Sequence, residues 1–264
     1  ELEFRFAKSF CMISILSPAK TLDFESKVPN IALTQPNNVE ASVELISKLR
    51  KLSSKKLAKL MHLSTDLADL NVMRFHDWSI EFDENNSRPA ILAFSGEVYR
   101  GMENKGFSTQ DLQFAQNHVR LLSGLHGVLR PLDLIQPYRL EMGTTMSIGR
   151  KKNLYQYWSK SVTESINQSM TEAKTDTLLN LASTEYSKVV DFKNIQGRVV
   201  TPHFKDRKGD EYKIVMTWAK LARGKMAGFI IRNRITELEH IKAFEEYVFS
   251  EKDSTDTDWV FLRG

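Results

Sequence analysis

Short apolar runs and helically spaced apolar positions both recur along this chain. The segment ISIL at residues 13–16 predicts a short strand, and the SPAKT that follows it is a turn signal. Apolar side chains every three or four positions over 38–51 predict a helix. Read in the same way, the rest of the chain predicts helices over 53–60, 64–78, 111–122, 153–170, 218–234 and 237–244, and strands over 90–94, 176–183, 197–206, 211–218, 246–249 and 258–262.

Polar residues at the starts of several helices support their placement. Ser53 or Ser54, Ser64 and Asn153 are of the types that accept a hydrogen bond from the first free backbone amides. The segment STQD at 108–111 is similar to a capping box, although Asp stands where Glu or Gln is usual.

Strands and helices follow one another without a strict βαβ rhythm, which predicts an α+β fold with a mixed sheet and surrounding helices. No internal repeat, low-complexity tract or linker is evident. We therefore expect a single compact domain over residues 12–264. Residues 1–11, ELEFRFAKSFC, are expected to be a leader segment, with Met12 as the natural start.

Composition is that of an ordinary globular protein, with 41% hydrophobic and 27% charged residues among 264. No apolar run approaches the ~20 residues of a membrane span, so no membrane partner is expected. The one cysteine, Cys11, precludes a disulfide within the chain, which fits a reducing compartment and predicts a cytoplasmic protein.

The net charge of +4 is modest, but its distribution is uneven. Residues 48–59 carry six basic side chains, and no acid lies between Glu44 and Asp66. Residues 213–234 carry six more, again without an acid. Either segment alone is as easily a solvated helix face, but two of them together favour an anionic partner.

The stretch LLSGLHGVLRPLDLIQPYRLEMG at 121–143 combines two glycines with the most apolar part of the chain. Gly124 and Gly127 would each cost a packing helix about 1 kcal/mol relative to alanine. Their presence indicates a place where another group must come close to the backbone.

This stretch and six others resemble the YaaA family of peroxide-stress proteins. The others are ISILSPAKTLDF, RFHDW, AFSGEVYRGM, LYQYW, LLNLASTEY and WAKLARGKMAGFIIRNR, in the same order from Met12 to near the C-terminus. The resemblance implies a bacterial cytoplasmic protein that resists hydrogen peroxide, with links to limiting free iron and to DNA binding. It also implies a compact α+β fold with a positively charged cleft and a helix–hairpin–helix-like element.

In a helix–hairpin–helix, a glycine turn lets backbone amides approach a phosphate without a Cβ in the way. Gly124 and Gly127 are candidates for that turn, with Arg130 and Arg139 as charge partners. Their spacing departs from the usual pattern, in which the glycines are two apart. The alternative is a tight turn that packs its apolar residues into the core.

Two further segments could contact phosphates. The SPAKT loop offers Lys20 between hydroxyl side chains, although it lacks the glycines of a P-loop. The segment 218–234 places Lys220, Arg223 and Lys225 beside small residues that would leave a helix backbone open. The alternatives are a plain surface turn for the first segment and a core-packing helix for the second.

A polar pocket is also possible. Arg139 and Glu141 lie two apart in YRLEMG, and NLASTEY supplies Asn180, Ser183, Glu185 and Tyr186. If these residues meet Lys20 and Arg223, they form either an active site or a buried salt-bridge network. The structural alternative is modestly favoured.

Iron binding by a recognisable motif is not expected. The six histidines include no HExxH pair, and the single Glu-x-x-His at 237–240 is half of what a di-iron bundle needs. We expect no cofactor and no stoichiometric metal.

Two hypotheses remain. The first is a non-enzymatic DNA-binding protein of the peroxide response that limits oxidative DNA damage and intracellular free iron. The second is an enzyme acting on a small anionic or nucleotide-like substrate in a pocket lined by Lys, Arg and Glu. The first hypothesis predicts phosphate contacts with little sequence specificity, made by Lys20, Gly124, Gly127, Arg130, Arg139, Lys220, Arg223 and Lys225.

Overall fold

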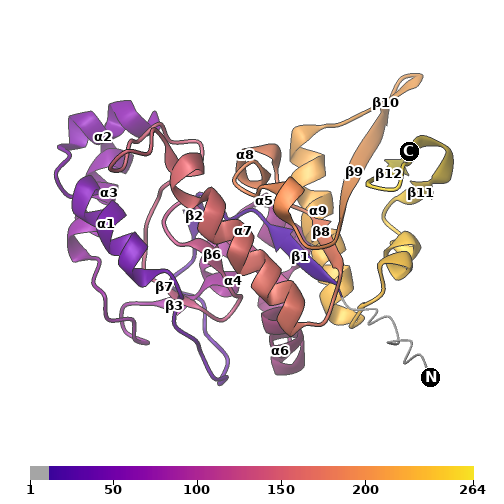
Figure 1. Cartoon of the computed structure of the whole chain (residues 1–264), viewed down its shortest axis with the longest axis horizontal. Helices are drawn as coiled ribbons and strands as arrows, with labels where there is room; N and C mark the ends of the chain where they lie inside the picture. The colour runs from indigo at the N-terminus through magenta and orange to yellow at the C-terminus, as the bar shows by residue number, and fades with distance from the viewer. Residues whose placement is uncertain (1–11) are drawn as a thin grey trace, which may run out of the picture.

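A mixed eight-stranded sheet runs through the computed structural model, which describes residues 12–264 (Figure 1). The predicted leader lies outside the described residues. The sheet order is β11-β12-β9-β8-β1-β5-β6, and β10 pairs with β9. The strands are β1 (Ile13–Leu16), β5 (Val119–Ser123), β6 (Gly127–Leu129), β8 (Thr177–Asn180), β9 (Arg198–Lys208), β10 (Glu211–Lys213), β11 (Val248–Ser250) and β12 (Asp258–Arg263).

The middle of this sheet is parallel. Strand β1 pairs in parallel with β5 and β8, β8 with β9, and β9 with β12, while β6, β10 and β11 add antiparallel pairs. All four residues of β1 are buried, as expected for a parallel strand covered on both faces. The predicted α+β class with a mixed sheet is confirmed.

Helices surround the sheet, and α1 to α3 form a separate lobe at one end (Figure 1). At the other end the β9–β10 hairpin projects from the body. Two small antiparallel pairs, β2 (Thr21–Leu22) with β4 (Phe94–Ser95) and β3 (Arg88–Pro89) with β7 (Leu134–Ile135), join loops to the core. The α-helices are α1 (Val39–Leu49), α2 (Ser54–Met61), α3 (Thr65–Asp77), α4 (Ala90–Ala93), α5 (Glu97–Met102), α6 (Thr109–His118), α7 (Leu154–Glu172), α8 (Thr184–Ser187) and α9 (Met216–Arg232).

The local cap signals act as the sequence predicts. Ser53, Ser64 and Asn153 each accept a hydrogen bond from a backbone amide in the first turn of α2, α3 and α7. Ser108 and Asp111 form a complete capping box at α6, so Asp serves here as well as the usual Glu.

Three predictions of secondary structure are wrong. The strand predicted over 211–218 ends at Lys213, and Met216 already begins helix α9. The apolar run 90–94, predicted as a strand, is the single-turn helix α4 followed by β4. The prediction failed because an apolar run this short has no clear periodicity that would distinguish a strand from a helix. The helix predicted over 111–122 ends at His118, and Val119–Ser123 forms strand β5 beside β1. Burial next to β1 decides the conformation of this segment, rather than its helical propensity.

Helices α5 and α9 approach each other closely enough for backbone contact. A Cβ on Gly224 would lie 1.8 Å from the carbonyl oxygen of Val98, and one on Gly101 would lie 2.2 Å from that of Leu221. Neither position has room for a methyl group. The small residues of α9 therefore pack against α5, and the prediction that they leave the helix open to a phosphate backbone is wrong.

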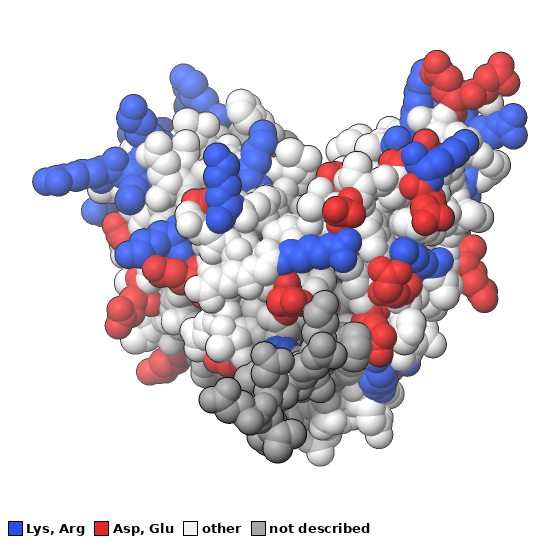
Figure 2. Space-filling model, turned by 45° about the vertical axis from the view of Figure 1, so that its right-hand side comes forward, with Lys and Arg blue, Asp and Glu red and all other residues white. Residues whose placement is uncertain are grey.

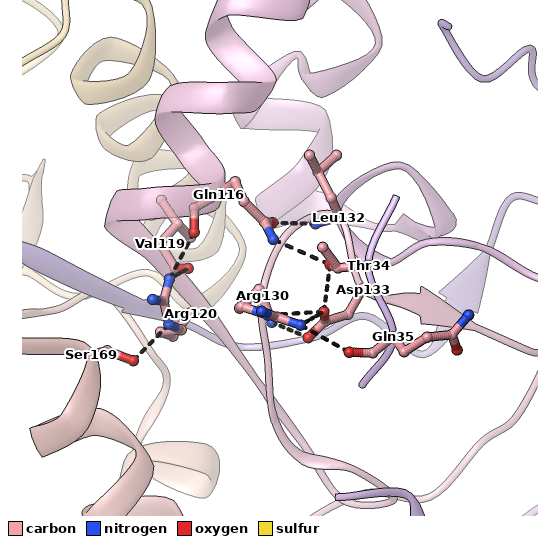
Figure 3. A network of polar contacts seen from close by, with 9 residues as sticks. All are labelled: Thr34, Gln35, Gln116, Val119, Arg120, Arg130, Leu132, Asp133 and Ser169. Atoms are coloured by element: carbon pink, nitrogen blue, oxygen red, sulfur yellow. Dashed lines mark hydrogen bonds and ion pairs between the residues drawn. The ribbon is translucent and has the colours of Figure 1, made fainter. Parts of the chain in front are cut away.

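A polar network ties the end of β6 to α6 and the N-terminal loop (Figure 3). The buried carboxylate of Asp133 pairs with the Arg130 guanidinium at 2.8 Å and accepts the Thr34 hydroxyl at 2.6 Å. Arg130 also donates to the backbone oxygen of Gln35. In the same view Arg120 donates to Ser169 from the neighbouring strand β5. Arg130 is thus held in a structural network.

Replacing Gly224 by alanine is expected to destabilise the protein by about 3 kcal/mol or more, because the new methyl group would overlap backbone atoms that cannot rotate away. The melting temperature of the variant measures this. Gly106→Ala is the matched control, since nothing lies within 4 Å of the methyl group that it would add, and it should melt near the parent temperature. Equal melting temperatures for the two variants would contradict the close helix contact.

Candidate functional site

A cavity of about 340 Å³ lies at the carboxyl ends of strands β1 and β8. The loop after β1 provides one wall, the start of α5 a second, and α8 and α9 the rest. The lining residues are 17–21, 95–98, Ser183, Glu185, Tyr186, Lys220 and Arg223.

Hydrogen bonds between the two strand-end loops fix the floor of this pocket. The amide of Ser183 donates to the hydroxyl oxygen of Ser17 at 2.8 Å, and the two hydroxyls are 3.1 Å apart. The buried Tyr99 hydroxyl donates to the carbonyl oxygen of Ser17. Asn180 accepts the amide of Ala182 at 3.1 Å and so holds the turn after β8. The loops are therefore set in place before any ligand binds.

Ion pairs within the fold determine which cations of segment 213–234 remain free to bind an external anion. Four of the six pair with acids brought from elsewhere in the chain: Lys213 with Glu211, Lys225 with Glu246, Arg232 with Glu103 and Arg234 with Asp111. Within residues 12–264, Lys220 and Arg223 have no acid partner, and both line the pocket.

Arg223 is half-buried, and its burial lowers the pKa of the guanidinium. A desolvated cation without a counter-ion is unfavourable by itself. An anion that entered the pocket would supply the missing partner.

The structure brings part of the predicted polar cluster together. Glu141 is buried and contacts two cations, Lys20 at 3.1 Å and Arg139 at 3.0 Å. Lys20 is mostly exposed and also lines the pocket, whereas Arg139 is largely buried beside its carboxylate. Asn180 is buried beneath the turn that it holds. The pocket and the Arg139–Glu141 pair are thus adjacent, joined through Lys20.

One wall of the pocket was missed by reasoning from the sequence. Residues 95–98, at the junction of β4 and α5, received no role there. The motif AFSGEVYRGM that contains them is one of those shared with the YaaA family, which is the only signal that pointed to them.

Comparison with known proteins gives the family. Residues 12–253 match the family described as peroxide stress protein YaaA. Relatives named as UPF0246 proteins from Aliivibrio fischeri and Colwellia psychrerythraea are each 48% identical over 254 residues, which is 96% of this chain and 98% and 99% of theirs. A relative of the same name from Saccharophagus degradans is 44% identical over the same length.

The chain belongs to the YaaA family of peroxide stress proteins. Membership supports a role in the response to peroxide stress. It leaves the chemistry of that role to be argued from the site.

In this YaaA-family protein the glycine turn joins strands β5 and β6 rather than two helices. Gly124 and Gly127 are both buried, and the amides of Leu125 and His126 already donate to the hydroxyl of Ser123. The expectation that the two glycines expose amides to a phosphate is therefore wrong. A helix–hairpin–helix is not found at this segment.

The same glycines are needed for packing. The Gly124 carbonyl accepts the indole N–H of Trp158 at 2.9 Å, and a Cβ on Gly127 would lie 2.7 Å from the Trp158 ring. Gly127 also has a φ of +71°, which disfavours other residues. The hairpin is a tight structural turn, the alternative that the sequence left open.

Among residues 12–264, no three His, Cys, Asp or Glu side chains lie close enough together to hold a metal ion. In that same part of the chain, no helix combines the length and the apolar character that a membrane span requires.

Gly127→Ala should lower stability by about 2 to 4 kcal/mol, through its positive φ and the clash with Trp158. Gly149→Ala is a matched control, because its φ is +53° but nothing lies within 4 Å of the added methyl. It should show only the backbone cost of about 1 kcal/mol. Chemical denaturation of both variants measures the difference, and equal losses would show that the Trp158 contact is unimportant.

The buried His126 predicts a pH dependence of stability. The Ser42 hydroxyl lies 3.0 Å from Nδ1 of His126, and Nε2 has no partner among the described residues. Burial lowers the pKa of His126 to about 3.

Because the unfolded chain takes up this proton near pH 6.5 and the folded one only near pH 3, stability should fall as pH decreases between these values, by about 1.4 kcal/mol per pH unit. His126→Asn removes the titrating group. Unfolding free energies measured between about pH 7 and 5 should then show a shallower slope in the variant. Parallel slopes would contradict a neutral His126.

Proposed function

We propose that this protein binds DNA through its phosphates in the cytoplasm and so limits oxidative damage to DNA during peroxide stress. Family membership supports the link to peroxide. The distribution of unpaired positive charge supports the link to DNA.

The observation that carries the proposal is the basic surface of α2 and of the turn before it. Lys51 in the turn and Lys55, Lys56 and Lys59 on α2 are all exposed, and none of them pairs with an acid within residues 12–264. Figure 2 shows Lys and Arg side chains gathered on the upper part of the lobe that carries α2, beside a hollow in the surface. The acid-free stretch predicted from the sequence thus stays unpaired in the fold.

Arg50 differs from its lysine neighbours. Its guanidinium donates to the carbonyl oxygens of Phe75 and His76, at the end of α3. It therefore fixes the angle between α1 and α3 and is not free for an external anion. The exposed cations of α2 are lysines, whose ammonium groups act as point charges rather than bidentate readers of bases.

Such a surface suits contacts that neutralise phosphates without reading sequence. Lys220, exposed at the pocket without an acid partner in the described chain, is a further candidate for a backbone contact, and Lys20, which is exposed but pairs with Glu141, is a weaker one. Arg130 and Lys225, each paired with an acid, are weaker candidates than the sequence indicated. The proposal includes an effect on intracellular free iron as a secondary consequence, not through iron storage by a cluster of side chains.

Neutralising Lys55 and Lys59 tests the proposal. These residues are four apart on α2 and share a face, so Lys55→Gln with Lys59→Gln should remove about two phosphate contacts. Duplex affinity near 0.1 M salt should fall roughly tenfold or more, and the slope of log affinity against log salt should decrease by about two. Fluorescence anisotropy of a labelled duplex at several salt concentrations measures both.

Lys193→Gln is the matched control. Lys193 is exposed and precedes β9, at the amino-terminal edge of the parallel strands and away from the pocket. It should leave affinity and slope unchanged. Removing the like charges of α2 should not destabilise the helix, so a double variant that melts like its parent and still binds DNA normally would refute the proposal.

A further inference from the structure

We infer that the pocket between the β1 and β8 loops binds a phosphorylated ligand of mononucleotide size, with the phosphate on Arg223 and Lys220. This site is separate from the α2 surface proposed to bind duplex DNA. Its existence does not depend on that proposal.

The position of the pocket in the sheet is the first argument. From β1 the chain moves to β5 on one side of the sheet, and later returns to β8 on the other side. The loops leaving β1 and β8 therefore diverge at a point where the strand order reverses. In open sheets with parallel strands, ligands bind in the crevice outside the carboxyl ends at such a point.

The charges around the pocket are the second argument. Arg223 is half-buried without an acid partner in the described chain, and Lys220 lies one turn earlier on α9. From the opposite loop comes Lys20, which shares the single carboxylate of Glu141 with Arg139. One negative charge cannot neutralise both cations. Two acids, Glu97 and Glu185, also line the pocket, but Glu97 pairs with Arg100 on α5. The three lining cations therefore leave an excess of positive charge that a phosphate would balance.

The rest of the lining suits the remainder of a nucleotide. Pro18, Ala19 and Val98 provide apolar surface, and Gly96 lets two walls meet, since a Cβ there would lie 3.2 Å from the Ala19 methyl. The Glu185 carboxylate makes one long contact of 3.4 Å, to the amide of Gly143. It remains free to accept hydroxyl groups, as acidic residues do for ribose in nucleotide sites.

The volume of about 340 Å³ lies at the lower end of the range for small-molecule sites. This volume matches a single nucleotide rather than the width of a duplex. The ligand is therefore either a free mononucleotide or a single unpaired nucleotide of a DNA strand.

Calorimetric titration with AMP, adenosine and inorganic phosphate tests the inference. AMP should bind with one-to-one stoichiometry, and adenosine, which lacks the phosphate, should bind at least tenfold more weakly. Arg223→Met should reduce AMP affinity at least tenfold. Lys193→Met, far from the pocket, should leave it unchanged.

The melting temperature of Arg223→Met separates a binding role from a structural one. Because the buried guanidinium has no counter-ion, its removal should leave the melting temperature unchanged or raise it. A structural arginine would lower it. If the variant fails to fold, Lys220→Gln at an exposed position provides the same affinity test.

The source of the nucleotide is decided by comparing a fully paired duplex with one that carries a single unpaired nucleotide. If the parent protein prefers the duplex with the unpaired nucleotide, the ligand is a nucleotide of the DNA strand. In that case Arg223→Met should lose the preference, and the double variant Lys55→Gln with Lys59→Gln should keep it. Binding of AMP with no such preference identifies a free nucleotide. Absence of binding of both AMP and the unpaired nucleotide to the parent protein, or equal binding to Arg223→Met, overturns the inference.

Discussion

The contact between α5 and α9 is the constraint on which the candidate site depends. The two helices meet backbone to backbone at Gly101 and Gly224, where a methyl group on either would overlap a carbonyl oxygen. Helix α5 begins at the wall formed by 95–98, and α9 carries Lys220 and Arg223. A larger side chain at either glycine would separate the walls and withdraw the cations. Gly224, one of the small residues of segment 218–234 that the sequence linked to phosphate access, thus serves the site indirectly, by letting α9 approach α5.

Ion pairing turns two similar basic segments into different surfaces. Both lack acids in the sequence, but the fold brings Glu103, Asp111 and Glu246 to the segment that contains α9. Only the two cations at the pocket remain unpaired there within the described residues. The lysines of α2 receive no acid and stay solvated. The tertiary structure therefore leaves two unpaired cations together at the pocket, which suits a small anionic ligand. On α2 it leaves the lysines spread over an exposed surface, which suits an extended polyanion.

The sequence predicted correctly those elements whose structure depends on neighbouring residues along the chain. Caps at Ser53, Ser64 and Asn153, the parallel strand β1 and the long helices α7 and α9 follow from side-chain type and periodicity. The errors lie where contacts distant in sequence decide: 119–123 becomes a strand beside β1, and the glycine turn closes over Trp158. For the site, Lys20, Lys220 and Arg223 were predictable as cations, but which acids neutralise their neighbours was not. The wall at 95–98 was missed because a two-residue strand and a six-residue helix have too few positions to show a period.

Burial lowers the pKa of several basic groups, and two of them, His126 and Arg223, respond in different ways. His126 is fully buried and loses its proton, since burial lowers its pKa to about 3, so the imidazole carries no charge at neutral pH. Arg223 has no such option, because a guanidinium stays protonated at neutral pH even where burial lowers its pKa. Within residues 12–264 no acid pairs with it, although Glu97 and Glu185 line the same pocket. The buried Arg120 also lacks an acid partner, but its guanidinium donates to Ser169 and to the carbonyl oxygens of Gln116 and Val119. An anion in the pocket would give Arg223 the kind of partner that Arg120 finds within the fold. The position of Arg223 is thus better explained by a ligand than by the stability of the fold.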